Sequence, residues 1–308
     1  MSRETGVDVG TDICESCGGR TMRTIHSSKR QGLDVGRCSK CGMVSVLNKP
    51  SPERLAELYA PTETYEQYVA AQRSTDEAKY TACLDRLVDL LPSPSAGNVV
   101  FDVGAGAGAF LALARTYGFG VSGNEISDVA RRMCDERHGI PLTIGQLNEE
   151  GGADRYDAMT MWCVLAHVHD PSGFLADAYR LLKPGGILYL QTPRWCAIDA
   201  IGLATSRLSG GRLPHVIDRR VNAAHLRLFN ASNLSATLTD VGFNVIQISP
   251  RCEFGLTTRS YLESMQVPRT LRRPLAWGLD GIVDRTAFLQ NILVAFAKKP
   301  RTEACVGS

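Results

Sequence analysis

Between residues 97 and 193 the chain alternates short apolar runs with amphipathic stretches of helical length, and this alternation limits its fold more than any other feature. The apolar runs are expected as strands at 99–103, 121–123, 142–144, 157–162 and 187–191. Helices are expected between them at 109–117, 127–138 and 171–182. Strands that alternate with helices usually pair in parallel and are covered by helices on both faces. The sequence therefore predicts an α/β fold with a doubly wound sheet.

Further elements are expected on both sides of this region. Before it, apolar residues recur with helical spacing over 76–91, and a proline- and serine-rich linker follows at 92–97. After it, the pattern predicts a helix at 232–240 and strands at 244–249 and 291–297.

The composition is that of an ordinary globular protein, with 44% hydrophobic and 21% charged residues among 308. The 34 lysines and arginines nearly balance the 32 aspartates and glutamates, so the net charge of +2 does not indicate a dedicated nucleic-acid binder. No apolar run approaches the roughly 18 residues of a membrane span, and the start of the chain carries no apolar signal segment. A cytoplasmic location without a membrane partner is therefore expected.

Two Cys-x-x-Cys pairs stand near the N-terminus, and each is followed by a glycine. Cys14 and Cys17 form the first pair, and Cys38 and Cys41 form the second. Two such turns can place four thiolates around one tetrahedral ion, so the spacing predicts a closed, structural zinc site. A redox pair is the alternative, but it needs only one Cys-x-x-Cys. His26 lies between the pairs and is expected at the surface, and the other six cysteines are expected to be small buried or incidental residues.

A glycine-rich turn follows the first strand of the alternating region, and it permits two readings. The spacing of Gly104, Gly106 and Ala109 also satisfies the dinucleotide-binding fingerprint, so an NAD oxidoreductase is one reading. Glu125 ends the second strand, where a carboxylate can accept both hydroxyls of a ribose in either reading. Asp102 stands two residues before the first glycine, where it can meet an ammonium group or order the turn. This acid favours a ligand that carries an amino-acid moiety.

Four stretches of the chain together resemble the class I S-adenosylmethionine-dependent methyltransferases: 101–108, 123–127, 156–167 and 182–186. The resemblance implies a seven-stranded Rossmann-like sheet whose last strand lies antiparallel between the fifth and the sixth. The four-cysteine ribbon and the segments 225–229 and 241–243 resemble a subset of this family that modifies sugars and other small metabolites in biosynthetic pathways.

The resemblance also implies which residues bind S-adenosylmethionine. Its amino-acid moiety would be lined by Asp102, Gly104, Gly106 and Gly108. Its ribose and adenine would be contacted by Glu125, Ile126, Gln146 and Leu147, where Gln146 replaces the acidic residue common in the family. Trp162 and Cys163 would lie beneath the sulfonium, and Tyr65 and Tyr68 would cover the cofactor or, alternatively, pack on a helix face.

Two histidines are candidates for the base that removes a proton from the methyl acceptor. His167 follows the fourth strand, in the sequence Leu165-Ala166-His167 where the family usually has Leu-Glu-His. His225 follows an irregular stretch and is expected to fold over the same pocket. The alternative for His167 is a packed residue that bonds to backbone, and for Asp170 it is a surface N-cap of the helix that begins at Pro171.

The segment 194–227 carries a net charge of +4 on a chain whose total is +2, and family members place a substrate lid here. Its arginines indicate either an anionic substrate, such as a sugar nucleotide, or a solvated face. They are Arg194, Arg207, Arg212, Arg219, Arg220 and Arg227, opposed by only Asp199 and Asp218.

These inferences divide the chain into a zinc ribbon, a helical cap with a linker, and a methyltransferase domain with an inserted lid, followed by a disordered tail. Their expected bounds are 1–48, 49–95, 96–299 with the lid at 194–232, and 300–308. The expected activity is O- or C-methylation of a small anionic metabolite, with no nucleic-acid partner and an undetermined oligomeric state. The alternatives are an RNA methyltransferase that grips RNA with the basic ribbon, and a module that binds the cofactor without catalysis.

Overall fold

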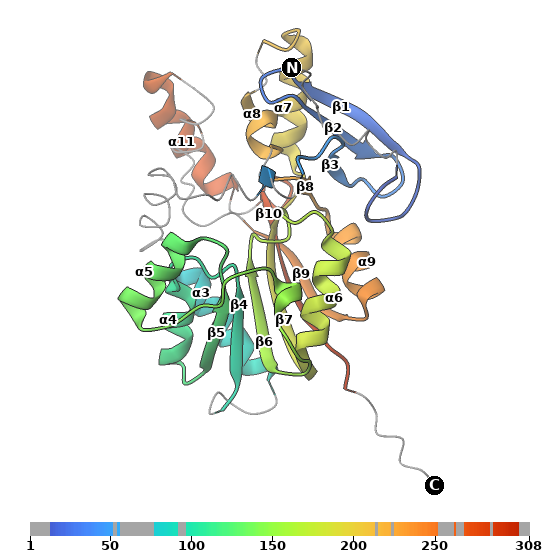
Figure 1. Cartoon of the computed structure of the whole chain (residues 1–308). Coiled ribbons are helices and arrows are strands. Elements are labelled where there is room, and N and C mark those ends of the chain that lie inside the picture. The colour runs from blue at the N-terminus through green and yellow to red at the C-terminus, as the bar shows by residue number, and fades with distance from the viewer. Residues whose placement is uncertain are drawn as a thin grey trace, which may run out of the picture.

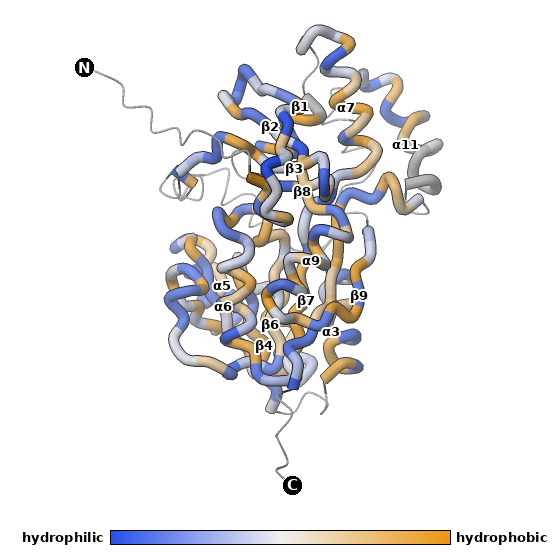
Figure 2. Tube along the Cα trace, turned by 90° about the vertical axis from the view of Figure 1, so that its right-hand side faces the viewer, coloured by the Kyte–Doolittle hydropathy of each residue, from blue (hydrophilic) through white to orange (hydrophobic). Residues whose placement is uncertain are grey.

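The structure is a computed structural model that describes residues 13–51, 54–55, 77–91, 97–212, 215–222, 225–251, 262, 268–283 and 286–301. These residues form a large mixed sheet covered by helices and a small antiparallel sheet at one end of it (Figures 1 and 2). Among the described residues, none of the helices combines the length and the apolar composition of a membrane span.

The large sheet has the strand order β5-β4-β6-β7-β10-β9. Its strands are β4 (Val99–Val103), β5 (Gly120–Asn124), β6 (Tyr156–Trp162), β7 (Leu182–Pro193), β9 (Asn244–Arg251) and β10 (Ile292–Lys298). The pairs among β5, β4, β6 and β7 are parallel, and β10 is antiparallel to both of its neighbours, β7 and β9. This position of the last strand confirms the prediction from the family resemblance.

Helices cover both faces of the large sheet, as the alternating pattern predicts. One apolar cluster joins the sheet to α3 (Glu77–Leu90), α4 (Ala109–Thr116) and α5 (Asp128–His138). A second cluster on the other face joins it to α6 (Pro171–Leu181) and α9 (Ala231–Val241) (Figure 1). Asp170 caps α6, because its carboxylate accepts from the N–H groups of Ser172 and Gly173.

The small sheet contains β1 (Met22–Ser28), β2 (Leu33–Cys38), β3 (Val44–Val46) and β8 (Arg227–Leu228), in that order. The fourth strand, β8, comes from the segment expected as a substrate lid and pairs antiparallel with β3. Leu228 is fully buried in one apolar cluster with Val35 and Val44. The ribbon is therefore completed by residues almost 200 positions further along the chain.

Two helices of the same late segment contact the ribbon. They are α7 (Ala197–Leu208) and α8 (His215–Arg220), and Arg207 of α7 donates to the carbonyl of Ile25. His26 is wrongly expected at the surface: its side chain is only 9% exposed and its Nε2 lies 2.8 Å from Oδ1 of Asp218 in α8. The packing of α8 on the ribbon is a tertiary contact that the sequence pattern does not reveal.

The expected strand at 142–144 is a second correction. Within the described residues the large sheet has six strands rather than seven, and Thr143 contributes only an isolated parallel bridge to Asn124. The chain turns directly afterwards, because Gly145 has a φ of 113° and a 3-10 helix begins at Leu147. One bridge is thus all that the backbone geometry allows. The remaining described helix is α11 (Arg269–Val283).

Candidate active site and metal centre

The glycine-rich turn joins β4 to α4 and lies against the carboxyl end of β5. Gly104 and Gly108 have φ values of 66° and 79°, a region that favours glycine. A Cβ at Gly108 would also lie 2.2 Å from Sγ of Cys134, so a larger residue does not fit there. The N–H of Gly106, which also has a positive φ of 56°, donates to Oε2 of Glu125 at 2.9 Å. The turn therefore has the tight geometry that close approach of a ligand requires.

Glu125 is buried at the end of β5 and organises the turn. Its second carboxylate oxygen accepts from the N–H of Ser127 at 2.9 Å. Burial raises the pKa of Glu125, while the bonds from these backbone groups oppose the increase. An ionised carboxylate has about four acceptor sites, so two are left for the hydroxyls of a ribose. Ile126, next in the chain, is 46% exposed and available to an adenine.

Asn124 is not among the residues that the sequence predicts for the site. Its side chain accepts from the N–H of Gly104 at 3.3 Å and donates to the carbonyl of Gly145 at 3.0 Å. It thereby ties the glycine turn to the loop that carries Gln146 and Leu147. Gln146 is exposed, whereas the side chain of Leu147 is fully buried, so only the backbone of Leu147 is available to a ligand.

Asp102 lies inside the sheet, 1% exposed, directly before the turn. Thr160 on β6 donates its hydroxyl to Oδ1 of Asp102 at 2.6 Å. Burial, together with the negative charge of Glu125, raises the pKa of Asp102 to about 8, although the bond from Thr160 opposes the increase. Without a cation beside it, this carboxyl is therefore largely protonated at neutral pH.

Trp162 and Cys163 end β6 and diverge. The Trp162 ring packs into an aromatic cluster, with centroids 4.5 Å from Tyr189, 4.7 Å from Tyr80 and 5.3 Å from Phe110. Its buried Nε1 has no hydrogen-bond partner among the described residues. Cys163 has a φ of 67°, which is rare for a residue other than glycine, and its N–H donates to the carbonyl of Gln191 on β7 at 3.0 Å.

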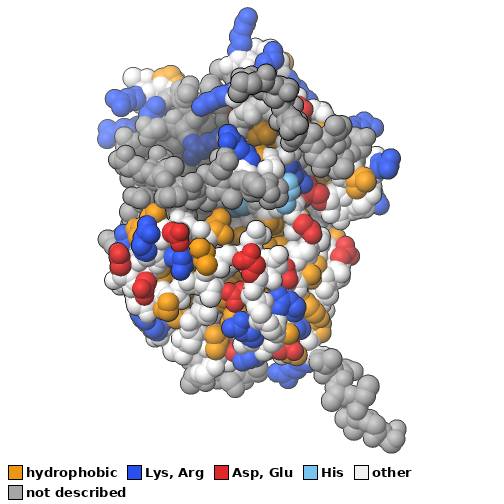
Figure 3. Space-filling view, viewed as in Figure 1, with side chains coloured by type: hydrophobic (Ala, Val, Ile, Leu, Met, Phe, Trp, Pro, Cys, Tyr) orange, Lys and Arg blue, Asp and Glu red, His pale blue; other side chains and the backbone are white. Residues whose placement is uncertain are grey.

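The two candidate histidines lie together beyond the end of β6. The ring centroids of His167 and His225 are 4.7 Å apart. Cys163 joins them, and one ligand atom from each of the three residues lies within 4.8 Å of the others. Burial lowers the pKa of His225 to about 3, with smaller contributions from the nearby His167 and Arg220, so this imidazole is neutral at physiological pH. In Figure 3, histidine side chains reach the surface at the level where the two sheets meet.

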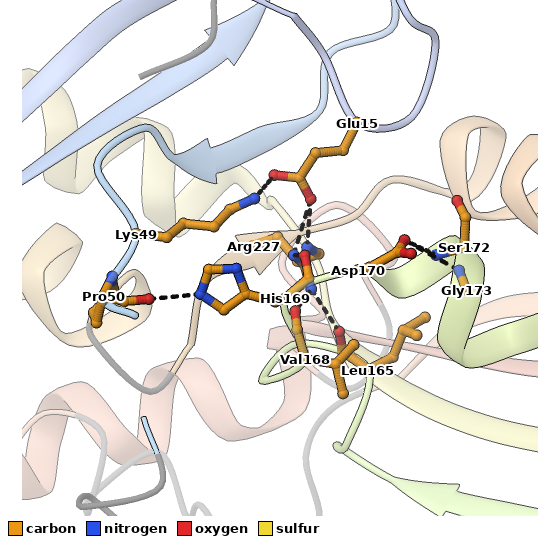
Figure 4. Close-up of polar contacts among 10 residues, drawn as sticks. All are labelled: Glu15, Lys49, Pro50, Leu165, Val168, His169, Asp170, Ser172, Gly173 and Arg227. Atoms are coloured by element: carbon orange, nitrogen blue, oxygen red, sulfur yellow. Dashed lines mark hydrogen bonds and ion pairs between the residues drawn. The ribbon is translucent and has the colours of Figure 1, made fainter. Parts of the chain in front are cut away.

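Arg227 holds the loop that carries His167 (Figure 4). It is fully buried, and its guanidinium donates to the carbonyls of Leu165, Val168 and His169. Its positive charge is paired with Glu15, whose carboxylate lies 2.9 Å from Nη2 and also contacts Lys49. Because the side chain is enclosed, Arg227 fits neither reading of the basic segment, since it faces neither solvent nor an open substrate site.

The other arginines of the segment differ in what they contact. Arg220 is 11% exposed and pairs with the buried Asp199 at 2.8 Å, while its Nη2 donates to two backbone carbonyls. Arg194 donates to the carbonyl of Ala287. Arg212 and Arg219 are exposed. The segment is therefore partly structural, and only some of its positive charge can face a substrate.

The four N-terminal cysteines converge, as their spacing predicts. Sγ of Cys14 lies 3.5 Å from that of Cys41, and Sγ of Cys17 lies 3.7 Å from that of Cys38. Zinc–sulfur bonds of about 2.3 Å in a tetrahedron separate the sulfurs by about 3.8 Å. The N–H of Cys41 points at Sγ of Cys38 at 3.4 Å, as expected around a thiolate ligand. The donor set and its geometry fit one zinc ion.

Tyr65 and Tyr68, expected to cover the cofactor, lie outside the described residues, as do most of the expected cap and residues 302–308 of the tail. Their expected roles stay predictions.

A family described as "Methyltransferase domain" matches residues 73–248, which is more than half of the chain. A protein of a Streptomyces fradiae transposon, described as uncharacterized, is 30% identical over 64% of this chain and 56% of its own length. The demethylmenaquinone methyltransferase of Tropheryma whipplei is 40% identical over 30% of this chain and 41% of its own length. The ubiquinone biosynthesis O-methyltransferase of Proteus mirabilis is 36% identical over 31% of this chain and 42% of its own length. The chain thus spans about half or less of the length of these curated relatives.

Solved structures of similar fold include proteins with different activities. The cyclase SpnF superposes with a TM-score of 0.54 at 18% identity and covers 82% of this chain and 98% of that one. A phosphoethanolamine N-methyltransferase of Haemonchus contortus, in complex with S-adenosyl-L-methionine, has a TM-score of 0.53 at 16% identity and covers 77% and 56%. At such identities the likeness shows the fold alone.

Proposed function

Because this chain belongs to the methyltransferase-domain family, we propose that it transfers the methyl group of S-adenosylmethionine to a small molecule bound beside His167 and His225. The observation that supports this most is the juxtaposition of two sites at one edge of the sheet. The nucleotide cradle, which consists of residues 102–108, 124–127 and 143–147, lies at the carboxyl ends of β4 and β5. The two histidines lie beyond the end of the adjacent strand β6.

The cradle offers a partner for each polar part of the cofactor. Asp102 can pair with the ammonium group, and the glycine turn admits the carboxylate near the start of α4. Glu125 can accept from both ribose hydroxyls. An NAD oxidoreductase is the weaker reading, because a buried acid at position 102 suits an ammonium group that NAD lacks at this place.

S-adenosylmethionine supplies an electrophilic methyl group on a sulfonium, so the protein has mainly to align the acceptor and exclude water. His167 can also take the proton that an oxygen or carbon nucleophile loses, whereas His225, whose pKa is lowered to about 3, would be a much weaker base. A small acceptor agrees with the names of two relatives, a demethylmenaquinone methyltransferase and a ubiquinone biosynthesis O-methyltransferase. Only the exposed arginines of the segment, among them Arg219, could pair with an anionic acceptor.

The ribbon completes the proposal. Its four cysteines would hold a structural zinc ion with no open coordination position, so this ion would take no part in catalysis. The ribbon's task is then mechanical, because Glu15 lies between the ligands Cys14 and Cys17 and pairs with the arginine that holds the His167 loop.

The test is methyl transfer by the purified full chain, with S-adenosylmethionine labelled in the methyl group and a small-molecule fraction of cell extract as acceptor. A labelled small product supports the proposal. Labelled RNA in a parallel assay would identify the protein as an RNA methyltransferase. Binding of S-adenosylhomocysteine with no transfer to any fraction would instead identify a module that only binds the cofactor.

The proposed role of the histidines has its own readout once a product is known. His167→Ala should lower kcat by about 10²–10⁴-fold, the usual contribution of a general base, with little change in S-adenosylhomocysteine affinity. His169→Gln is the matched control, because it alters an imidazole on the same loop whose Nε2 contacts the carbonyl of Pro50 instead. Full turnover by both His167→Ala and His225→Ala would remove the base from the mechanism.

A further inference from the structure

Cys163, His167 and His225 form a cluster with three potential metal ligands, whereas removal of a proton needs only one imidazole. It combines one thiol with two imidazoles, and one potential ligand atom from each lies within 4.8 Å of the others. All three residues are half-buried, so the cluster is neither sealed in the core nor spread over the surface.

The backbone around the cluster is fixed from several sides. Cys163 is held in its left-handed conformation by the bond from its N–H to Gln191 on β7. The N–H of His167 closes a turn onto the carbonyl of Val164 at 2.9 Å. A left-handed non-glycine residue persists only where its surroundings determine it, and such residues concentrate at functional sites.

The segment with His225 is tied to the same loop. The N–H of Leu226, the next residue, donates to the carbonyl of Ala166 at 2.9 Å, and the N–H of His225 donates to Oδ1 of Asn222 at 2.9 Å. Arg227 then holds three carbonyls of the 165–169 loop, as Figure 4 shows for Leu165, Val168 and His169. The three side chains therefore come from two segments that are bonded to each other rather than from independent loops.

We propose that Cys163, His167 and His225 bind a second zinc ion, distinct from the ion of the ribbon, with the fourth coordination position open. One thiolate and two imidazoles are ligands that zinc accepts, and sites with three protein ligands are those in which zinc binds water or substrate. The ribbon site, with four thiolates, is closed. The two sites would therefore differ in their ligands, and only the second would bind water or substrate at the zinc ion.

The open position indicates the class of acceptor, and this step rests on the proposed function, whereas metal binding does not. The cluster lies where the acceptor is proposed to bind, so a hydroxyl or enol oxygen of the acceptor would be the fourth ligand. Zinc lowers the pKa of a bound hydroxyl, and the proton then leaves to solvent. In the metal-loaded protein the two histidines would be ligands, and the ion would provide the deprotonation that a free histidine would otherwise provide.

Zinc content of the purified full chain, after dialysis against zinc-buffered solution, tests the site directly. We expect about two zinc ions per chain in the wild type and about one in Cys163→Ser and in His225→Gln, because each variant removes one of only three ligands. His169→Gln should retain both ions. Equal zinc content in the wild type and both cluster variants would overturn the proposal, as would an equal loss in His169→Gln.

Cobalt titration of the wild type keeps the test decisive if the variants do not fold. A four-thiolate site and a one-thiolate, two-imidazole site give different cobalt absorption spectra, so two spectral steps are expected. A single step with the four-thiolate spectrum would overturn the proposal. The two proposals fail separately: methyl transfer with one zinc ion per chain refutes only the second site, and two zinc ions without transfer refute only the proposed function.

Discussion

The nucleotide cradle differs in construction from the junction at which Glu15 of the ribbon and Arg227 meet the 165–169 loop. In the cradle, the hydrogen bond from Gly106 to Glu125 joins residues only 19 positions apart in the sequence. The glycine turn and the end of β5 belong to neighbouring β-α units. At the junction, Glu15 and Arg227 are 212 positions apart in the sequence. Both are also distant in sequence from the 165–169 loop, whose carbonyls Arg227 binds. The cradle is local and made mostly of backbone geometry, whereas the junction is non-local and made of buried charge.

This difference predicts which property each region controls. A bond from a turn to a carboxylate shapes a surface that a ligand completes, so changes there should alter binding. A buried arginine with three carbonyls and one carboxylate is already complete, so its removal should alter stability. The predictions below test this division, from the largest expected effect to the smallest.

Cys14→Ser should have the largest effect, because the apparent free energy of zinc binding in small structural sites is about 10–16 kcal/mol. We expect loss of the ribbon's zinc ion and a large fall in the thermal unfolding midpoint, with S-adenosylhomocysteine binding retained in whatever protein stays folded. Cys83→Ala is the control, since Cys83 is a buried residue of α3 and lies outside the four-thiol cluster. Unchanged stability of metal-free Cys14→Ser would show that the ribbon does not depend on zinc.

Arg227→Met should destabilise the chain by about 3–5 kcal/mol, the usual cost of breaking a buried ion pair from one side. The reason is that three carbonyls and Glu15 lose their donor together. Urea unfolding measures the effect, and Arg219→Met, at an exposed position of α8, should change stability by less than about 0.5 kcal/mol. Equal effects of the two variants would contradict the junction's structural role.

Glu125→Ala should weaken S-adenosylhomocysteine binding by about 2–3 kcal/mol, which is about 30- to 150-fold in Kd, because two charge-assisted bonds to ribose are lost. Calorimetry measures the change, and Glu136→Ala, an exposed acid on α5, is the control. A tighter complex of the wild type with NAD than with S-adenosylhomocysteine would mean that the cradle binds a different nucleotide.

Asp102 should make cofactor binding depend on pH. Its pKa is raised to about 8 by burial, with Glu125 adding to the shift, and only the ionised form can pair with the ligand's ammonium group. The affinity for S-adenosylhomocysteine should therefore rise by up to about tenfold per pH unit as the pH approaches 8 and level off above it. Asp102→Asn should bind more weakly at pH 8 and lose most of this dependence.

The same shift has the opposite sign for stability. The folded carboxyl holds its proton more tightly than the unfolded one, whose pKa is about 3.9, so its contribution favours folding below that value and is lost as the pH rises through about 8. Wild-type protein should thus lose stability relative to Asp102→Asn between these limits. A stability difference that does not change with pH would refute the shifted pKa.

Local features were predictable because their causes are local. The strand at 99–103, the positive φ angles of Gly104 and Gly108, and the N-cap at Asp170 follow from residue types within a few positions of each other. The two cysteine pairs were predictable for a related reason, since each pair makes its own turn and one ion would satisfy all four thiolates. The expected strand at 142–144 failed, because Gly145 turns the backbone after a single bridge.

The tertiary structure alone decided what Arg227, His26 and Cys163 do. By sequence, Arg227 was one of six arginines in a basic segment, His26 a surface residue and Cys163 the end of a strand. Each role depends on a partner that another element brings to it: Glu15 and the 165–169 loop, Asp218 of α8, and the two histidines. Composition and spacing do not reveal these long-range contacts, because a charged residue looks the same in the sequence whether its side chain is buried or solvated. Only the packing of β8 against β3 distinguishes them, since it removes the guanidinium from water and leaves the carbonyls and Glu15 as its partners.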